Sequence, residues 1–317
     1  MDNYNLLSCA GGGYFGYGEI LILQELEKIS GKQSYQIFDA MAGTSAGAIN
    51  TSALSIGVAA SCVLDFYTKW AAKIFVSDGF AAKLHLSPKY NSSELTAALK
   101  TILAIKDSNG NLRNSTLKDC KVNWMATALN MTTGLPTFFC SWLKSEDVIV
   151  NGTTLGSIVG YDSPLELWEI VLCSTAAPTY FPGEKFGSVY IDGGLTGCNS
   201  PDSILIDFVT DLSNGKQVKM LSLGSGDSKW TIDPESMITP SDIHVAFVVL
   251  NTFLAAGVDS SNVGAYMKLK NNYFHLSPYY DPNFEMDDIE TGSVKIPEAT
   301  KVLLDKYGKA LSDFLNT

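Results

Sequence analysis

The sequence predicts an α/β fold in which a mostly parallel sheet is covered by helices. Two strand–turn–helix units near the N-terminus support this prediction. An apolar strand over 5–10 leads into a glycine loop and a helix near 19–29, whose apolar residues recur at helical spacing. A second strand over 35–42 runs directly into a tight turn and a helix that ends near Val58. Strands that alternate with helices are typical of βαβ units.

The rest of the chain adds further elements in the same style. We expect helices and loops over 59–116, which form part of a substrate mouth, and a helix that starts at Ser163-Pro164 and closes a capping box at Glu166. The other expected elements are strands over 122–131, 137–142, 188–191, 219–223 and 273–276, a buried helix over 244–258, and a final amphipathic helix over 298–314. No linker divides the chain, so we expect one domain over 1–317, with a core over about 5–226 completed by about 227–317.

Composition excludes several classes of partner. The 317 residues are 46% hydrophobic and 17% charged, with a net charge of -11, which indicates a globular chain and argues against nucleic acid. Cysteines at 9, 62, 120, 140, 173 and 198 form no metal-binding pattern, and we expect them to be buried and reduced. We see no signal peptide, and the longest apolar stretch is shorter than the roughly 20 residues that span a bilayer. These features predict a cytoplasmic protein with peripheral contact at membrane surfaces.

The segment Gly43-Thr44-Ser45-Ala46-Gly47 fits the pattern G-x-S-x-G. Between a strand and a helix, this pattern is typical of a nucleophile elbow, in which a serine sits on a sharp turn and the flanking glycines give room for substrate. The N-terminus of the following helix favours developing negative charge. Ser45 is therefore the candidate nucleophile.

The loop Gly11-Gly12-Gly13-Tyr14-Phe15-Gly16 also joins a strand to a helix. Its amides, together with that of Ala46, could stabilise an oxyanion. The same glycines match the dinucleotide pattern G-x-G-x-x-G, with Asp39 as the ribose ligand. Two observations weigh against a nucleotide: Asp39 lies further along the chain than usual, and the second strand leads directly to Ser45.

Asp192 follows a short apolar strand and precedes two glycines. A serine nucleophile needs a base within hydrogen-bond reach, and partial burial raises the pKa of a carboxylate towards a useful value. A histidine base is the alternative. His275 has the chain order of a Ser–Asp–His triad, but His85, His244 and His275 all look structural.

Taken together, the glycine loop, the Ser45 turn and Asp192-Gly193-Gly194 resemble the three signature motifs of the patatin-like phospholipase family. The segments 133–139, 174–182 and 221–226 are also similar to it, so the likeness covers most of the chain. The resemblance implies a three-layer α/β/α fold and a dyad of Ser45 as nucleophile and Asp192 as base. It also implies an oxyanion hole that includes Gly11, Gly12 and Gly13, no cofactor or metal, and release of fatty acid from glycerolipids.

Two departures from the family pattern stand out: Phe15 where an arginine is frequent, and Cys198-Asn199-Ser200-Pro201 after the aspartate motif. We expect neither to abolish activity. Asp287 and Asp288 are expected to be solvated. Three other functions stay open: a soluble esterase or thioesterase with the same dyad, a lipid-binding or storage protein, and a nucleotide-dependent oxidoreductase. The sequence identifies neither a regulatory ligand nor an oligomeric state.

Overall fold

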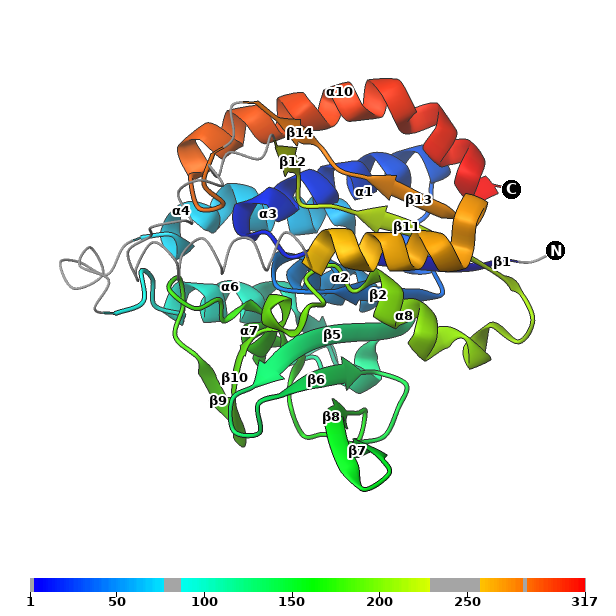
Figure 1. Ribbon diagram of the computed structural model, residues 1–317. Coiled ribbons are helices and arrows are strands. Elements are labelled where there is room, and N and C mark those ends of the chain that lie inside the picture. The colour runs from blue at the N-terminus through cyan, green and yellow to red at the C-terminus, as the bar shows by residue number, and fades with distance from the viewer. Residues whose placement is uncertain (1–2, 77–86, 229–256, 282–283, 317) are drawn as a thin grey trace, which may run out of the picture.

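The computed structural model describes residues 3–76, 87–228, 257–281 and 284–316, arranged as a twisted sheet between helical layers (Figure 1). One half of the sheet is parallel, in the order β13, β11, β1, β2, β5. These strands are Tyr273–Leu276, Gln217–Leu223, Asn3–Cys9, Ala40–Gly43 and Asn123–Asn130. The predicted strands and their parallel arrangement are therefore confirmed here.

The other half of the sheet is mixed. Strand β6 (Leu135–Cys140) is antiparallel to β5, as expected for strands joined by a tight turn, and it is followed in the sheet by β8 (Thr153–Val159) and the edge strand β7 (Glu146–Val150). Strand β10 (Ser188–Asp192) pairs antiparallel with both β5 and β9 (Glu184–Phe186). The sequence did not lead us to expect β7, β8 or β9.

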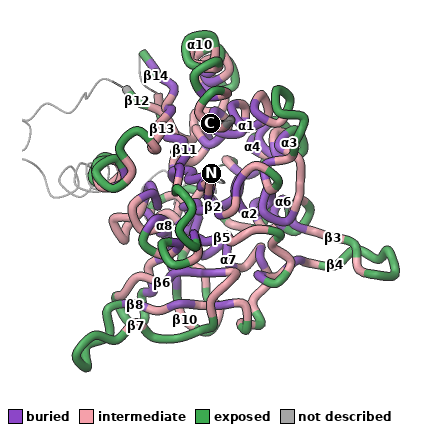
Figure 2. The backbone as a smooth tube through the Cα atoms, turned by 90° about the vertical axis from the view of Figure 1, so that its right-hand side faces the viewer, coloured by how far each residue is buried: buried purple, intermediate pink, exposed green. Residues whose placement is uncertain are grey.

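Alternate residues on each strand enter two separate hydrophobic cores, as the period of two in a strand requires. On one face Leu7, Met41 and Trp124 pack with α1 (Gly16–Ser30), α2 (Ala46–Ser55), α3 (Ala60–Lys69), α6 (Ser93–Ile102), α7 (Leu167–Thr175) and α10 (Ile289–Asn316). On the other face Leu6 and Met125 pack with α8 (Asp202–Val209) and the helical segment 257–269. This is the expected three-layer α/β/α arrangement, and Figure 2 shows the buried backbone concentrated in its middle.

Several boundaries differ from the sequence prediction. The second strand begins only at Ala40, because a Gln33–Gln36 capping box turns residues 34–36 into a 3-10 helix. Helix α7 begins at Leu167 and not at Pro164. Glu166 is its N-cap and forms a capping box with Glu169. The Ser163 hydroxyl instead accepts a hydrogen bond from the Leu165 amide in a local turn. The expected helix over 244–258 lies almost wholly outside the described residues.

The six cysteines are free, as expected. Cys9, Cys140 and Cys173 are buried and Cys120 and Cys198 are half-buried, but the prediction of burial was wrong for Cys62, which is exposed on α3. Within the described ranges, no helix combines the length and hydropathy needed to span a membrane.

The parallel core predicts a clear difference between two leucines. Leu7 is fully buried at the centre of the sheet, and Leu112 is 74% exposed on the outer strand β4 (Leu112–Asn114). We expect Leu7→Ala to lower the free energy of unfolding by about 2–5 kcal/mol, because it leaves a cavity, and Leu112→Ala to change it by less than about 0.5 kcal/mol. Urea denaturation measures both, and equal effects would contradict the proposed core.

Candidate active site

Ser45 lies at the turn between β2 and α2, the context that the sequence predicts for a nucleophile elbow. Its backbone has φ 53° and ψ -121°, a strained conformation for a non-glycine residue. The Ser45 amide donates a hydrogen bond of 3.0 Å to the Ser174 hydroxyl. A Cβ atom on Gly47 would lie 2.1 Å from the Cys9 carbonyl oxygen, so this glycine lets α2 pack directly against β1.

Asp192 reaches Ser45 because two strands share one edge of β5. Strand β2 pairs with the first part of that edge and ends where Gly43 faces Ala126. Strand β10 runs in the opposite direction along the second part and ends where Asp192 faces Ala128. The two C-terminal ends therefore meet head to head, and the Ser45 side chain is close enough to the Asp192 carboxylate to lower its pKa. The strand expected before Asp192 is therefore present, and it runs antiparallel to β5.

Burial sets the acidity of Asp192, whose exposed fraction is 5%. It raises the pKa of the carboxyl to about 6, against an ordinary value of 3.8, while hydrogen bonds from the Gly194 amide (2.8 Å) and Ser45 act in the opposite direction. A carboxylate with this pKa is ionised near neutral pH and is a better base than an exposed one.

The glycine loop lies beside Ser45, but its amides differ in availability. The Gly11 amide donates to the Asn199 carbonyl at 2.8 Å, so the expected role of Gly11 as an oxyanion donor was wrong in this structure. Gly13 and Ala46 both line the cavity at Ser45. Each is the first residue of a helix, so neither amide has a partner in its own helix. Gly12 precedes Gly13, and no described acceptor binds its amide.

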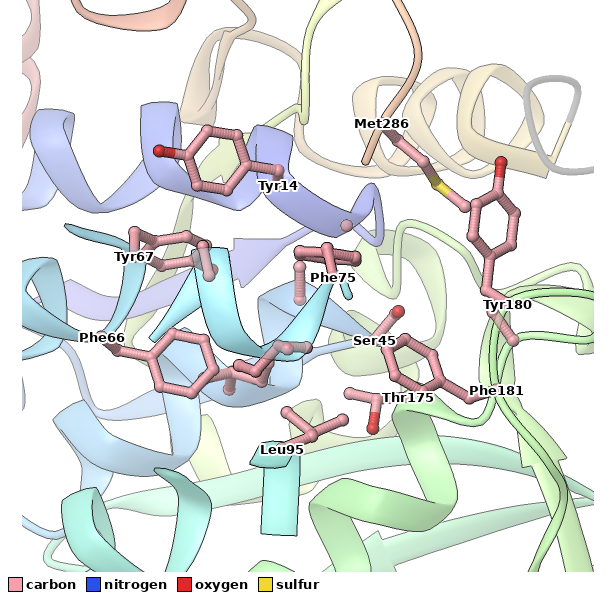
Figure 3. Close-up of a pocket in the computed structure, with 16 residues that line it drawn as sticks. Tyr14, Ser45, Phe66, Tyr67, Phe75, Leu95, Thr175, Tyr180, Phe181 and Met286 are labelled. Carbon is pink, nitrogen blue, oxygen red and sulfur yellow. The ribbon is translucent and has the colours of Figure 1, made fainter. Parts of the chain in front are cut away.

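An apolar cavity opens from Ser45 (Figure 3). Its walls come from the glycine loop, α2, the segment after α7, and α3, α4 (Ala71–Ile74) and α6, so residues 59–116 contribute to the mouth as expected. The apolar and aromatic lining residues are Tyr14, Ile49, Phe66, Tyr67, Ala71, Ile74, Phe75, Leu95, Ala177, Tyr180, Phe181 and Met286. Such a lining suits an acyl chain better than a polar substrate.

The segment around Asp287 closes one side of this cavity. Met286 lines it, and the Met286 carbonyl accepts the Tyr14 amide at 2.8 Å. The Asp287 side chain is only 4% exposed, because it forms an ion pair with Lys89 and accepts a hydrogen bond of 2.6 Å from the Tyr90 hydroxyl. The prediction that Asp287 is solvated was therefore wrong.

Phe15 occupies the position where the family often has arginine. Its ring stacks on Tyr280 at 5.2 Å between centroids and meets Phe284 edge to face at 5.0 Å. Aromatic packing thus anchors the glycine loop to the C-terminal part of the chain.

The competing site residues lie elsewhere. His275 bonds the Ser222 hydroxyl through Nδ1 at 2.9 Å and stacks on Tyr273. Its strand β13 is three places from β2 in the sheet, about 14 Å at ordinary strand spacing. Asp39 precedes β2 and accepts the Asn5 amide at 2.7 Å, so it lies at the opposite end of the strands from the glycine loop and cannot be a ribose ligand there. His85 and His244 lie outside the described residues.

Two buried residues that sequence reasoning missed tie the site together. The Thr44 hydroxyl contacts the Thr127 hydroxyl at 2.8 Å and donates to the Cys198 carbonyl at 2.6 Å. It thus joins the nucleophile turn to β5 and to the segment after Asp192. The Ser174 hydroxyl accepts a hydrogen bond from the Ser45 amide. The position of Thr44 inside the G-x-S-x-G pattern was the one local signal for its role.

Comparison with known proteins places the chain in a family. The sequence model of the patatin-like phospholipases matches residues 7–201. The chain belongs to the patatin-like phospholipase family, which classes it with lipid-hydrolysing enzymes.

Three relatives illustrate the range of the family. The chain is 27% identical to a cGAMP-activated phospholipase of Vibrio cholerae, over 74% of this chain and 68% of that protein. It is 26% identical to a cGAMP-activated phospholipase of Pseudomonas aeruginosa, over 98% and 88%. It is also 22% identical to Patatin-T5 of Solanum tuberosum, over 97% and 89%.

The raised pKa of Asp192 predicts a pH-dependent cost in stability. Because the folded-state pKa lies above the ordinary value, ionising this carboxyl destabilises the fold, by up to about 3 kcal/mol for two pKa units. The cost is absent below the ordinary value of 3.8 and is complete above about 6. We expect Asp192→Asn to stabilise the protein at pH 8 and to have little effect at pH 4. Urea unfolding at both pH values measures this, and an equal effect at the two would refute it.

Proposed function

We propose that this protein is a lipid acyl hydrolase of the phospholipase A type that works through a Ser45–Asp192 dyad. The observation that carries the proposal is the placement of Ser45 beside a buried carboxylate with a pKa of about 6, at the end of an apolar cavity. Membership of the patatin-like phospholipase family supports the same chemistry.

In the proposed reaction, Asp192 accepts the Ser45 proton as the hydroxyl oxygen attacks the ester carbonyl carbon. The carbonyl oxygen becomes an oxyanion, for which the Gly13 and Ala46 amides, with Gly12 beside them, are the candidate donors. Collapse breaks the bond to the alcohol, which takes the proton from Asp192 and leaves an acyl-enzyme. Water then attacks this ester, again giving its proton to Asp192, and the fatty acid departs with Ser45 restored.

The cavity favours a substrate with a long acyl group over a small polar ester, because its walls beyond Ser45 are aliphatic and aromatic. With lipid as the substrate, the enzyme would contact a membrane surface transiently. A soluble esterase or thioesterase with the same dyad is the competing function. It would prefer monomeric over micellar substrate, whereas a phospholipase would show the reverse.

The proposed dyad is tested by single substitutions. We expect wild type to release fatty acid from mixed phospholipid vesicles, and Ser45→Ala and Asp192→Asn to lose at least about 10³-fold in rate. His275→Ala should stay within about twofold, because a distant side chain contributes little to the transition state. Equal loss in His275→Ala would establish a triad instead.

The assay needs arms with and without cGAMP, because two of the relatives above are named for activation by it. If wild type is silent in both arms, a fluorophosphonate probe tests Ser45 directly. Absence of labelling would leave a lipid-binding or storage protein.

The proposed role of Asp192 as the base makes the rate depend on pH. The base must be ionised, so kcat/KM for a soluble ester should be constant above pH about 6 and fall roughly tenfold per pH unit below it. A rate profile from pH 4.5 to 8 measures this. Activity that persists unchanged to the lowest pH would mean that Asp192 is not the base.

A further inference from the structure

Asn50 is a buried polar residue in α2, five positions after Ser45, and the reaction proposed above does not use it. Its exposed fraction is zero, yet both its polar atoms are engaged. The side-chain nitrogen donates to the Gly16 carbonyl at 3.0 Å and to Glu19 Oε2 at 2.9 Å. The side-chain oxygen accepts a hydrogen bond of 2.9 Å from the Tyr67 hydroxyl.

The partners of Asn50 lie where the glycine loop passes into α1, and on α3. Gly16 ends the loop and begins α1, and Glu19 lies one turn further along that helix. The fully buried Glu19 carboxyl also lies beside Cys9 and Ala10, where β1 gives way to the loop. The Ala10 amide donates to the Leu223 carbonyl at 3.0 Å, and Glu19 Oε1 has no hydrogen-bond partner among the described residues. One side chain on the nucleophile's helix therefore hydrogen-bonds the end of the loop directly, and its partner Glu19 packs beside the start of the loop.

The helices are also in close contact at this point. A Cβ atom on Gly16 would lie 2.4 Å from the Tyr67 hydroxyl oxygen and 2.9 Å from the Ala46 Cβ atom. The N-termini of α1 and α2 thus pack without spare room, next to Gly13 and Ala46, which line the cavity. Tyr67 itself lines the cavity and packs its ring 6.1 Å from that of Tyr14 in the loop (Figure 3).

We propose that Asn50, held by Glu19 and Tyr67, is a positioning residue that fixes the Gly13 amide relative to Ser45 and the Ala46 amide. The inference rests on the proposed function, since it concerns the oxyanion donors of that reaction. An apolar residue at position 50 would leave buried polar groups of Glu19 and Tyr67 without this partner, so the network contributes to stability. It also holds α1, α2 and α3 in one fixed arrangement. Oxyanion stabilisation depends on donors held within tenths of an ångström, which is the property that a rigid link between the two helices supplies.

The test uses p-nitrophenyl acetate, whose acyl group is too short to fill the cavity, so that a loss cannot arise from a missing contact with a long chain. We expect Asn50→Ala to lower kcat by about 10–100-fold with KM within about twofold, and Tyr67→Phe to lower kcat by about 3–10-fold. The second-order rate of Ser45 labelling by a fluorophosphonate should fall in parallel.

Glu19 offers a conservative comparison. Burial raises the pKa of this carboxyl well above its usual range, so a neutral glutamine is its closest substitute. Glu19→Gln keeps an oxygen for the Asn50 amide and should retain kcat within about threefold, whereas Glu19→Ala should resemble Asn50→Ala. Leu54→Ala, a fully buried change near the end of the same helix, is the matched control: it should lower stability and leave kcat unchanged.

The outcomes separate the two proposals. If the probe does not label wild-type Ser45, the proposed function fails and this inference falls with it. If wild type is labelled but Asn50→Ala and Tyr67→Phe match it in kcat and labelling rate, the dyad stands and the positioning role is overturned. A fall in stability of Asn50→Ala without a fall in kcat overturns it in the same way. Should Asn50→Ala fail to fold, Tyr67→Phe decides, because it removes a single oxygen atom.

Discussion

Strand β5 has one edge left after it pairs with β6, and β2 and β10 divide that edge between them. Each strand must stop where the other begins, so their C-terminal residues are forced into contact over Ala126–Ala128. The proximity of Ser45 and Asp192 follows from this constraint, since each lies at the end of its strand. The rest of the site is arranged around that meeting point.

Two energetically unfavourable features lie together where β2 and β10 meet. Ser45 has a positive φ, and Asp192 is a carboxylate removed from water. Local hydrogen bonds offset both, through Ser174, Gly194 and the Thr44 contacts. Strain and perturbed acidity of this kind cluster at functional sites, where a more relaxed arrangement would be a poorer catalyst.

The cavity is assembled from distant parts of the chain. Helices α3 and α6 build one wall, and the segment around Met286 and Asp287 closes another through contacts with the glycine loop, Lys89 and Tyr90. The aromatic group of Phe15, Tyr280 and Phe284 binds the same segment to the loop. The cavity and the proposed oxyanion donors therefore share structural elements, and a change in one is expected to affect the other.

The sequence by itself determined the strand–turn–helix units, the placement of Ser45 on its turn and the glycine loop beside it, because periodicity and glycine spacing are local signals. The sequence also indicated Asp192, but it did not predict the direction of β10. That direction was decided by the part of the β5 edge that β2 leaves unpaired. Tertiary packing likewise used the Gly11 amide for Asn199, buried Asp287 against Lys89, and brought Asn50 to Glu19 and Tyr67. Most of these contacts join residues more than 30 positions apart, where neither propensity nor pattern carries information about the partner.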